Sequence, residues 1–187
     1  FVAMAWRLET TAALGSSAPP LVFQDATTAV SVAGQRLKFA PFGALADPSV
    51  IKFHVANTQL GIGVVATCPK TMQFAYAERG LRPQICICSY PDMQQVAALD
   101  GAAEVEVLAL AFSRDGTRLI SVSGAPDLAV SVWELKTGKK LCSATLSSAC
   151  AAASFNPKSS SAACVQAPSA LQLWQVKQSY QHYALLA

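Results

Sequence analysis

The sequence has few charged residues, and this scarcity limits the partners that it can bind. Of the 187 residues, 13% are Asp, Glu, Lys or Arg, about half of the usual share of about 25%. The 14 basic residues are scattered along the chain, and the formal net charge is only +3. A nucleic-acid-binding face needs clustered Lys and Arg, so we expect no nucleic-acid partner.

The sequence also lacks a long uninterrupted apolar run. A membrane-spanning helix needs about 20 such residues, so we expect no membrane partner. Apolar residues nevertheless make up 52% of the chain. That share is enough to bury a core, and it excludes wholesale disorder.

Metal-binding patterns are absent as well. A zinc site needs about four ligands, and no Cys-x-x-Cys or His-x-x-x-His pattern is present. Cys86 and Cys88 alternate along an expected strand, so we interpret them as small apolar residues of a sheet. The chain is longer than the small secreted domains that need disulfides, and we expect all the cysteines to be free thiols. They are residues 68, 86, 88, 142, 150 and 164.

Residues 107–146 have the pattern of four short strands joined by tight turns. Apolar and polar residues alternate with a period of two, and Asp115-Gly116 is a strong turn signal between two strands. Lys136-Thr-Gly138 indicates a second hairpin turn. The expected strands are 107–112, 117–123, 128–135 and 140–146.

This pattern repeats along the chain. The first strands of the units end at Phe23, Thr67, Phe112 and Phe155, which are 44, 45 and 43 residues apart. A unit of that length with four strands is typical of a β-propeller blade. A β-sandwich is the alternative, but it has about seven strands, whereas about sixteen are expected here.

We therefore predict an all-β fold of about four consecutive four-stranded blades of an incomplete WD40-type propeller. Propellers close a ring of about 4 to 8 blades, and open blades leave unpaired edges. We expect further blades beyond Ala187. The expected divisions are an N-terminal strand or linker (1–19), a degenerate blade (20–58), and three further blades (59–100, 101–147 and 148–187).

The third strand of two units carries the tryptophans Trp133 and Trp174. The run AFSRDGTRLISVSG followed by VSVWEL resembles the first three strands of a WD repeat. Glu134 and Gln175 replace the usual Asp after Trp, and no Gly-His opens a unit, so the Asp-His-Ser/Thr-Trp relay of these repeats cannot form. We expect packing to shape the blades, and the residues expected to contribute are Phe112, Asp115, Gly116, Trp133, Phe155 and Trp174.

Two motifs narrow the resemblance. One is Glu78-Arg-Gly-Leu-Arg-Pro83 ahead of a strand ending in Tyr90-Pro91, and the other is Ser123-Gly-Ala-Pro-Asp127 ahead of the Trp133 strand. Over about residues 20 to 176, the chain resembles the WD-repeat cilia- and flagella-associated protein family. The resemblance implies that the chain is part of an N-terminal propeller. It also implies a location in the axoneme, the cytoskeleton of a cilium or flagellum.

The resemblance further implies a non-catalytic scaffold that tethers inner-arm dynein motor heads to the doublet microtubule and so supports ciliary motility. The implied partners are a sibling WD-repeat paralogue, inner-arm dynein and doublet tubulin. Alternatives are a scaffold of the radial-spoke base, of the nexin–dynein regulatory region, or of a non-ciliary cytosolic assembly. The family motifs define no catalytic or binding residues, so the partner-binding residues are unknown and none is assigned.

A propeller enzyme is the other alternative, and the sequence contains little that supports catalysis. His182 has no acid next to it in the sequence to position it as a general base, and His54 is expected to be a half-exposed strand residue. Asp115 and Asp127 are expected in turns, where such side chains bond to nearby backbone. Gly61-Ile-Gly63 lacks the Lys and the following helix of a phosphate loop. We expect no catalytic residue, no cofactor and no metal.

Two surface segments and the tryptophans have competing interpretations. The run Lys136-Thr-Gly-Lys-Lys140 is the densest basic cluster, and it is either a solvated turn or a contact for acidic tubulin surfaces. Ser159–Ser161 is expected to be a flexible loop tip, open to phosphorylation. Trp133 and Trp174 are either partner anchors or packed between neighbouring sheets, and we expect packing.

Overall fold

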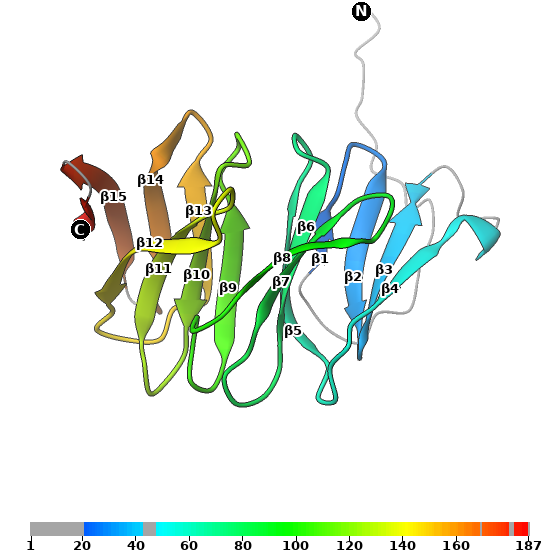
Figure 1. The fold of residues 1–187 in the computed structure, drawn as a ribbon, viewed down its shortest axis with the longest axis horizontal. Coiled ribbons are helices and arrows are strands. Elements are labelled where there is room, and N and C mark those ends of the chain that lie inside the picture. Colours follow the sequence, from blue (N-terminus) through cyan, green and yellow to red (C-terminus); the bar gives the residue numbers. More distant parts are fainter. Residues whose placement is uncertain (1–20, 43–47, 169, 180–181, 187) are drawn as a thin grey trace, which may run out of the picture.

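The computed structural model describes residues 21–42, 48–168, 170–179 and 182–186. In this part of the chain, four separate antiparallel sheets follow one another in sequence order (Figure 1). Each sheet has four strands that pair only with their sequence neighbours. The predicted all-β fold of four-stranded blades is confirmed, and the expected segment 1–19 lies outside the described residues.

We number the sheets as blades in chain order. Blade 1 consists of β1 (Leu21–Phe23), β2 (Thr28–Ala33), β3 (Arg36–Pro41) and β4 (Lys52–Val55). Blade 2 consists of β5 (Ile62–Cys68), β6 (Gln73–Glu78), β7 (Ile85–Ser89) and β8 (Gln95–Leu99). Blade 3 consists of β9 (Val107–Phe112), β10 (Arg118–Ser123), β11 (Ala129–Glu134) and β12 (Lys139–Thr145). Blade 4 consists of β13 (Ala152–Asn156), β14 (Ser159–Gln166), β15 (Leu171–Ser179) and β16 (His182–Leu186). A short 3-10 helix, η2, spans Pro48–Val50.

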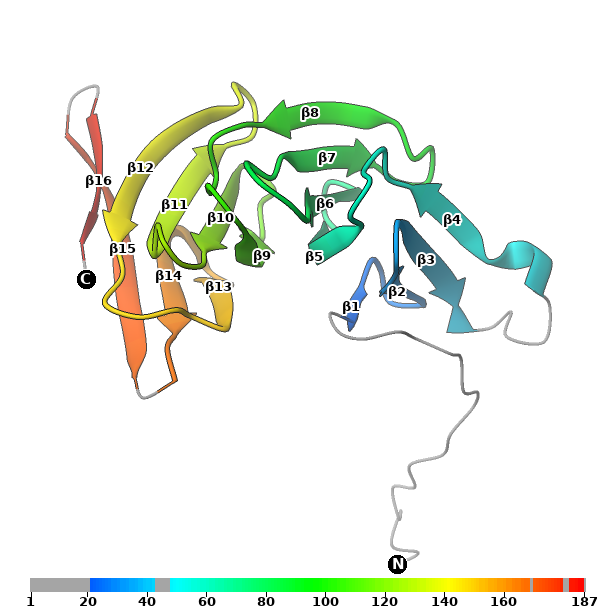
Figure 2. The same cartoon turned by 90° about the horizontal axis from the view of Figure 1, so that it is seen from below.

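The blades are arranged in an arc, which Figure 2 shows from one end. The first strands β1, β5, β9 and β13 lie on the concave side, and each contacts the first strand of the next blade. The turns between first and second strands all lie at one end of the molecule, uppermost in Figure 1. We call this end the hairpin face. The turns between second and third strands and the links between blades lie at the opposite end.

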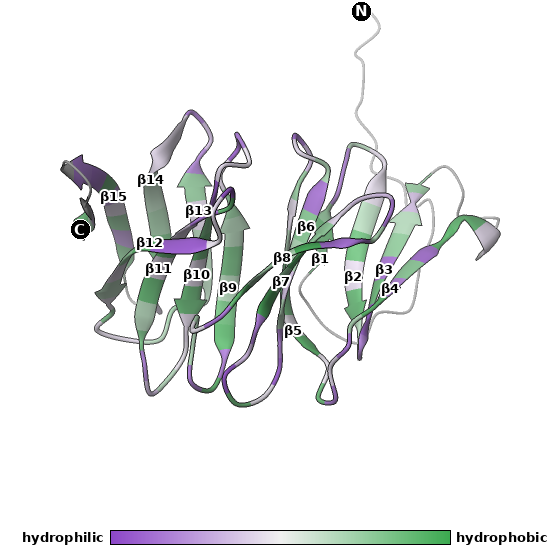
Figure 3. Ribbon diagram, in the orientation of Figure 1, coloured by the Kyte–Doolittle hydropathy of each residue, from purple (hydrophilic) through white to green (hydrophobic). Residues whose placement is uncertain are grey.

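The core fills the spaces between adjacent blades. Apolar residues line the middles of the strands, while polar residues gather at the turns (Figure 3). Between blades 1 and 2, the ring centroids of Phe39 and Phe74 are 5.0 Å apart. Trp133 is 2% exposed and belongs to the cluster that contains Ile85 of blade 2, and Trp174 is 8% exposed. Both tryptophans therefore pack between sheets and are not surface anchors.

The prediction of a loop tip at Ser159–Ser161 is wrong. The turn closes earlier, because Asn156 Oδ1 accepts a hydrogen bond from the Lys158 backbone N–H at 2.8 Å. Pairing then starts at once between Asn156 and Ser159, and all three serines are half-buried in β14. The Ser159 and Ser161 hydroxyl oxygens lie 2.8 Å apart, so two of these hydroxyls already share a hydrogen bond.

Candidate functional site

The residues first considered for catalysis do not form an acid–base pair in the described structure. His54 lies half-buried on β4, with its ring edge-on to Phe74 and its Nε2 atom 3.4 Å from the Tyr76 hydroxyl. Burial lowers the pKa of His54, although a backbone hydrogen bond with Met93 opposes that effect. A neutral ring wedged between blades 1 and 2 fits a packing role. His182 is the first residue of β16.

The cysteines are all free, and all but Cys164 are buried. Burial raises the pKa of Cys88 to about 12 and also raises that of Cys86, so both remain protonated thiols at neutral pH. Within the described ranges, no group of three or more His, Cys, Asp or Glu residues is placed to hold a metal ion. The same ranges contain no helix that is both long and apolar enough to cross a membrane.

Blade 3 keeps the two ends of the WD-repeat relay without its histidine. Trp133 Nε1 donates a buried hydrogen bond to Ser121 Oγ at 2.8 Å. At the other end, Asp127 Oδ2 accepts the Glu104 backbone N–H at 2.7 Å. The expectation that Asp127 would bond within its own turn is therefore wrong, because this carboxylate reaches the chain segment that leads into the blade.

The turn at Asp115-Gly116 joins β9 to β10 on the hairpin face. Asp115 Oδ1 accepts hydrogen bonds from the Ser113 hydroxyl at 2.6 Å and from the Thr117 hydroxyl at 2.8 Å. Burial alone would raise the pKa of Asp115, but these hydrogen bonds outweigh it and lower the pKa to about 2. Gly116 has φ +72°, and a Cβ atom there would overlap Thr71 of blade 2. The turn thus needs glycine both for its conformation and for contact between blades.

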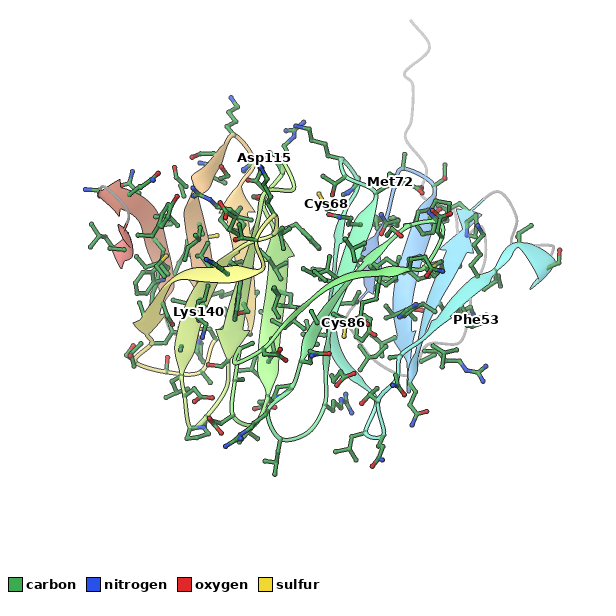
Figure 4. The ribbon with its side chains drawn as sticks, in the orientation of Figure 1. Phe53, Cys68, Met72, Cys86, Asp115 and Lys140 are labelled. Carbon is green, nitrogen blue, oxygen red and sulfur yellow. The ribbon has the colours of Figure 1, made fainter. Side chains whose placement is uncertain are left out.

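The hairpin face brings together three basic side chains that are far apart in the sequence. Lys70, Arg114 and Lys158 come from the first turns of blades 2, 3 and 4, and all three are exposed. They line one open groove of about 640 Å³. These three residues are scattered along the sequence, and the fold brings them together. The labelled residues Cys68, Met72 and Asp115 mark this end of the molecule in Figure 4.

An apolar hollow of about 560 Å³ continues this groove. Its lining includes Pro69, Pro157, the half-buried Phe112 and the buried Phe155. Lys70, Arg114 and Pro157 line both spaces. Phe112 and Phe155, expected to shape the blades, therefore also form the wall of a surface hollow. We call the two spaces together the hairpin groove.

The signal that locates the hairpin groove is present in the sequence, in the phase of the repeat. Lys70, Arg114 and Lys158 are each 44 residues apart, which is the length of one blade. Residues at the same phase of consecutive blades lie next to one another around the axis. Simple clustering along the chain does not find them.

The basic cluster at Lys136–Lys140 is only partly free. Lys140 Nζ donates a hydrogen bond to the Gly101 carbonyl at 2.7 Å and lies 4.9 Å from the centroid of the Trp133 ring. The ammonium group of Lys140 is thus engaged by groups of the molecule itself, although its side chain is exposed like those of Lys136 and Lys139. Figure 4 shows Lys140 away from the hairpin face.

A second groove, of about 560 Å³, lies between blades 2 and 3 at the opposite end. Its lining includes the exposed apolar residues Leu60, Leu81 and Val105, with Glu78 and Arg79 beside them. Burial raises the pKa of Glu78. The molecule therefore presents two separate hollowed loop faces, one basic and one largely apolar.

The fold defines the class of protein as a WD-repeat β-propeller. It superimposes on the crystal structure of Kluyvelomyces marxianus Hsv2 with a TM-score of 0.70 at 16% sequence identity. The match covers 89% of this chain and 56% of that one. At this identity the likeness concerns the fold alone.

The family follows from the sequence. Residues 49–179 match the family described as the CFAP43 N-terminal domain, and the chain belongs to that family. It is 32% identical over 112 residues to cilia- and flagella-associated protein 44 of Mus musculus, and 28% identical over 123 residues to cilia- and flagella-associated protein 43 of the same species. These matches cover 60% and 65% of the chain but only 6% and 7% of those proteins. The resemblance to the cilia- and flagella-associated group is confirmed, and this family membership places the chain in the cilium or flagellum.

Proposed function

We propose that this chain is part of a non-catalytic scaffold of the axoneme that holds inner-arm dynein motor heads against the doublet microtubule. The observation that carries the proposal is the match of residues 49–179 to the CFAP43 N-terminal domain family. The chain spans less than a tenth of the curated relatives that it matches. We therefore assign it one share of the task, as a rigid docking element within a longer assembly.

Contacts between blades support a mechanical role. Each pair of neighbouring blades is joined by at least one hydrogen bond in addition to its apolar core. The Thr67 hydroxyl donates to the Phe23 carbonyl at 2.6 Å, the Cys68 thiol donates to the Ser113 carbonyl at 3.9 Å, and Arg118 Nη1 donates to the Ser160 carbonyl at 3.0 Å. A tether under motor load needs such stiffness.

Two loop faces at opposite ends allow simultaneous attachment to different partners. Binding through two sites raises the overall affinity because the second contact forms at a high effective concentration. We propose that the partners are a sibling WD-repeat protein, inner-arm dynein and doublet tubulin. WD-repeat propellers typically act as scaffolds, and docking of this kind needs no active site.

Cryo-electron tomography of axonemes tests this proposal. Axonemes from cells that lack the protein are expected to lose density at the attachment of the inner-arm dynein heads, and re-expression of the wild-type protein restores it. Normal density at that attachment, with density missing at a radial-spoke base or in the nexin–dynein regulatory region, would overturn the proposal in favour of another axonemal scaffold.

A further inference from the structure

Three consecutive blades place a basic residue at the same point. Lys70, Arg114 and Lys158 each lie in the turn after the first strand of their blade, 44 residues apart. Because the first strands line the concave side of the arc (Figure 2), these turns lie close together. Blade 1 has Ala26 at the same phase, so the row of positive charges ends at blade 2.

These positive charges are not neutralised within the molecule. In the part of the chain that the structure describes, no carboxylate lies within 4.0 Å of Lys70, Arg114 or Lys158, and the ion pair found there joins Arg82 to Glu104 on another surface. Asp115 also lines the groove, where hydrogen bonds hold its carboxylate inside its own turn, and the one negative charge leaves the groove with a net positive charge. A concave surface with a net charge of one sign attracts ligands of the opposite sign.

The adjoining hollow places a second requirement on the ligand. Phe112, Pro69 and Pro157 give it apolar walls that take up apolar side chains. Each of the two spaces is within the range of about 300 to 1,000 Å³ that is typical of ligand pockets. The pair is therefore large enough for several side chains of a peptide, and it combines positive charge with an apolar recess.

We propose that the hairpin groove binds an extended acidic peptide segment of a partner protein. Carboxylates of the peptide contact Lys70, Arg114 and Lys158, and one apolar side chain enters the hollow beside Phe112. A single-stranded nucleic acid fits less well, because its bases need exposed aromatic faces to stack on and Phe112 and Phe155 are half-buried and buried. The inference goes beyond tethering of dynein and does not depend on it.

Fluorescence polarisation with the intact chain tests the proposal. The probe is a labelled peptide of alternating Glu and Leu, and the matched control peptide has Gln in place of every Glu. The Glu peptide is expected to bind, with an affinity that falls as salt is added, and the Gln peptide at least about tenfold more weakly. Equal binding of both peptides, or no binding of the Glu peptide, would overturn the proposal.

A charge-matched pair of variants locates the site. The variant Lys70→Ala/Arg114→Ala/Lys158→Ala is expected to weaken binding of the Glu peptide about tenfold. The control Arg36→Ala/Lys136→Ala/Lys139→Ala removes the same charge from exposed positions outside the groove and leaves affinity within about twofold. Thermal melts verify that both variants fold. Equal losses in the two variants, or tighter binding of an oligothymidylate than of the peptide in the same groove, would refute the assignment.

Discussion

Trp133 Nε1 donates a hydrogen bond to Ser121 Oγ across 2.8 Å, whereas Trp174, its counterpart in blade 4, has a buried Nε1 atom with no partner. The difference follows from strand register. Ser121 lies two residues after Leu119, which is directly opposite Trp133. In blade 4 the residue opposite Trp174 is Ala163, so the place of Ser121 is taken by Val165, which has no acceptor in its side chain.

This register difference predicts unequal roles for the two tryptophan N–H groups. In Ser121→Ala, the buried Nε1 atom of Trp133 loses its acceptor, and the free energy of unfolding should fall by about 1–3 kcal/mol. Trp133→Phe should lose the same hydrogen bond, so the double variant should cost less than the sum of the two single variants. Urea denaturation measures all three differences.

Trp174→Phe serves as the matched control for this prediction. It shortens a buried aromatic side chain in the same way but removes no hydrogen bond. We expect it to destabilise the protein less than Trp133→Phe does. If the two changes lowered the free energy of unfolding equally, the Trp133–Ser121 bond would contribute no measurable stability.

The packing of Trp133 between blades leads to a second prediction, which concerns a larger loss of stability. The ring lies in the core shared by blades 2 and 3, among residues that include Ile85 and Leu99. Trp133→Ala opens a cavity there and should lower the free energy of unfolding by about 3–5 kcal/mol. Differential scanning calorimetry checks this, and an unchanged melting temperature would contradict the packing role.

Gly116 offers a test of the contact between blades 2 and 3. Both Gly116 (φ +72°) and Gly138 (φ +68°) adopt the left-handed conformation, so alanine at either position is strained by about 1–2 kcal/mol. At Gly138 the nearest atom to a new Cβ, Leu99 Cδ2, is 3.7 Å away, whereas at Gly116 the Cβ would overlap Thr71. Gly116→Ala should therefore cost about 1–3 kcal/mol more than Gly138→Ala.

Chemical denaturation of the two alanine variants gives this difference directly, because the backbone strain cancels between them. Adding Thr71→Ser to Gly116→Ala removes the Cγ2 methyl group that the new Cβ would overlap and should recover part of the loss. Equal stability of Gly116→Ala and Gly138→Ala would mean that the close approach of Thr71 has no energetic weight.

Local signals were sufficient to predict the blades. The residues Asp115-Gly116 predict a turn, and the alternation of apolar and polar residues around Trp133 predicts a strand. The structure has strands on both sides of that turn. The prediction failed at Ser159–Ser161, because serine-rich composition suggested a loop while the short turn at Asn156 starts pairing immediately. Composition is a weaker signal than the hydrogen bonds available to a turn.

The interactions between strands were harder to predict. The Trp133–Ser121 bond depends on a diagonal relation across two strands, which needs the register as well as the strand positions. The groove at Lys70, Arg114 and Lys158 depends on the curvature that brings consecutive turns together. Sequence phase alone places these residues at equivalent points, but only the arc makes them neighbours.

His54 makes the free energy of unfolding depend on pH in the mildly acidic range. Burial lowers its pKa below the usual value of 6.5, with a backbone hydrogen bond to Met93 opposing this, so the unfolded chain takes up the proton at a higher pH than the folded chain does. Above about pH 6.5 both states are neutral at this residue and its full contribution is present. As the pH falls below 6.5, the unfolded state is protonated first and stability is lost until the folded pKa is passed.

A comparison of wild type with His54→Gln isolates this contribution. Glu78, whose pKa is raised by burial, shifts stability in the opposite direction, and Asp115, with a pKa lowered to about 2, acts only below about pH 4. Both groups are common to the two proteins and cancel. Urea denaturation at about pH 7.5 and about pH 5.5 should show a larger loss of unfolding free energy in wild type than in His54→Gln. An identical loss in the two proteins would mean that His54 is as easily protonated in the folded state as in the unfolded state, and its wedged position beside Phe74 and Tyr76 would then have no effect on its charge.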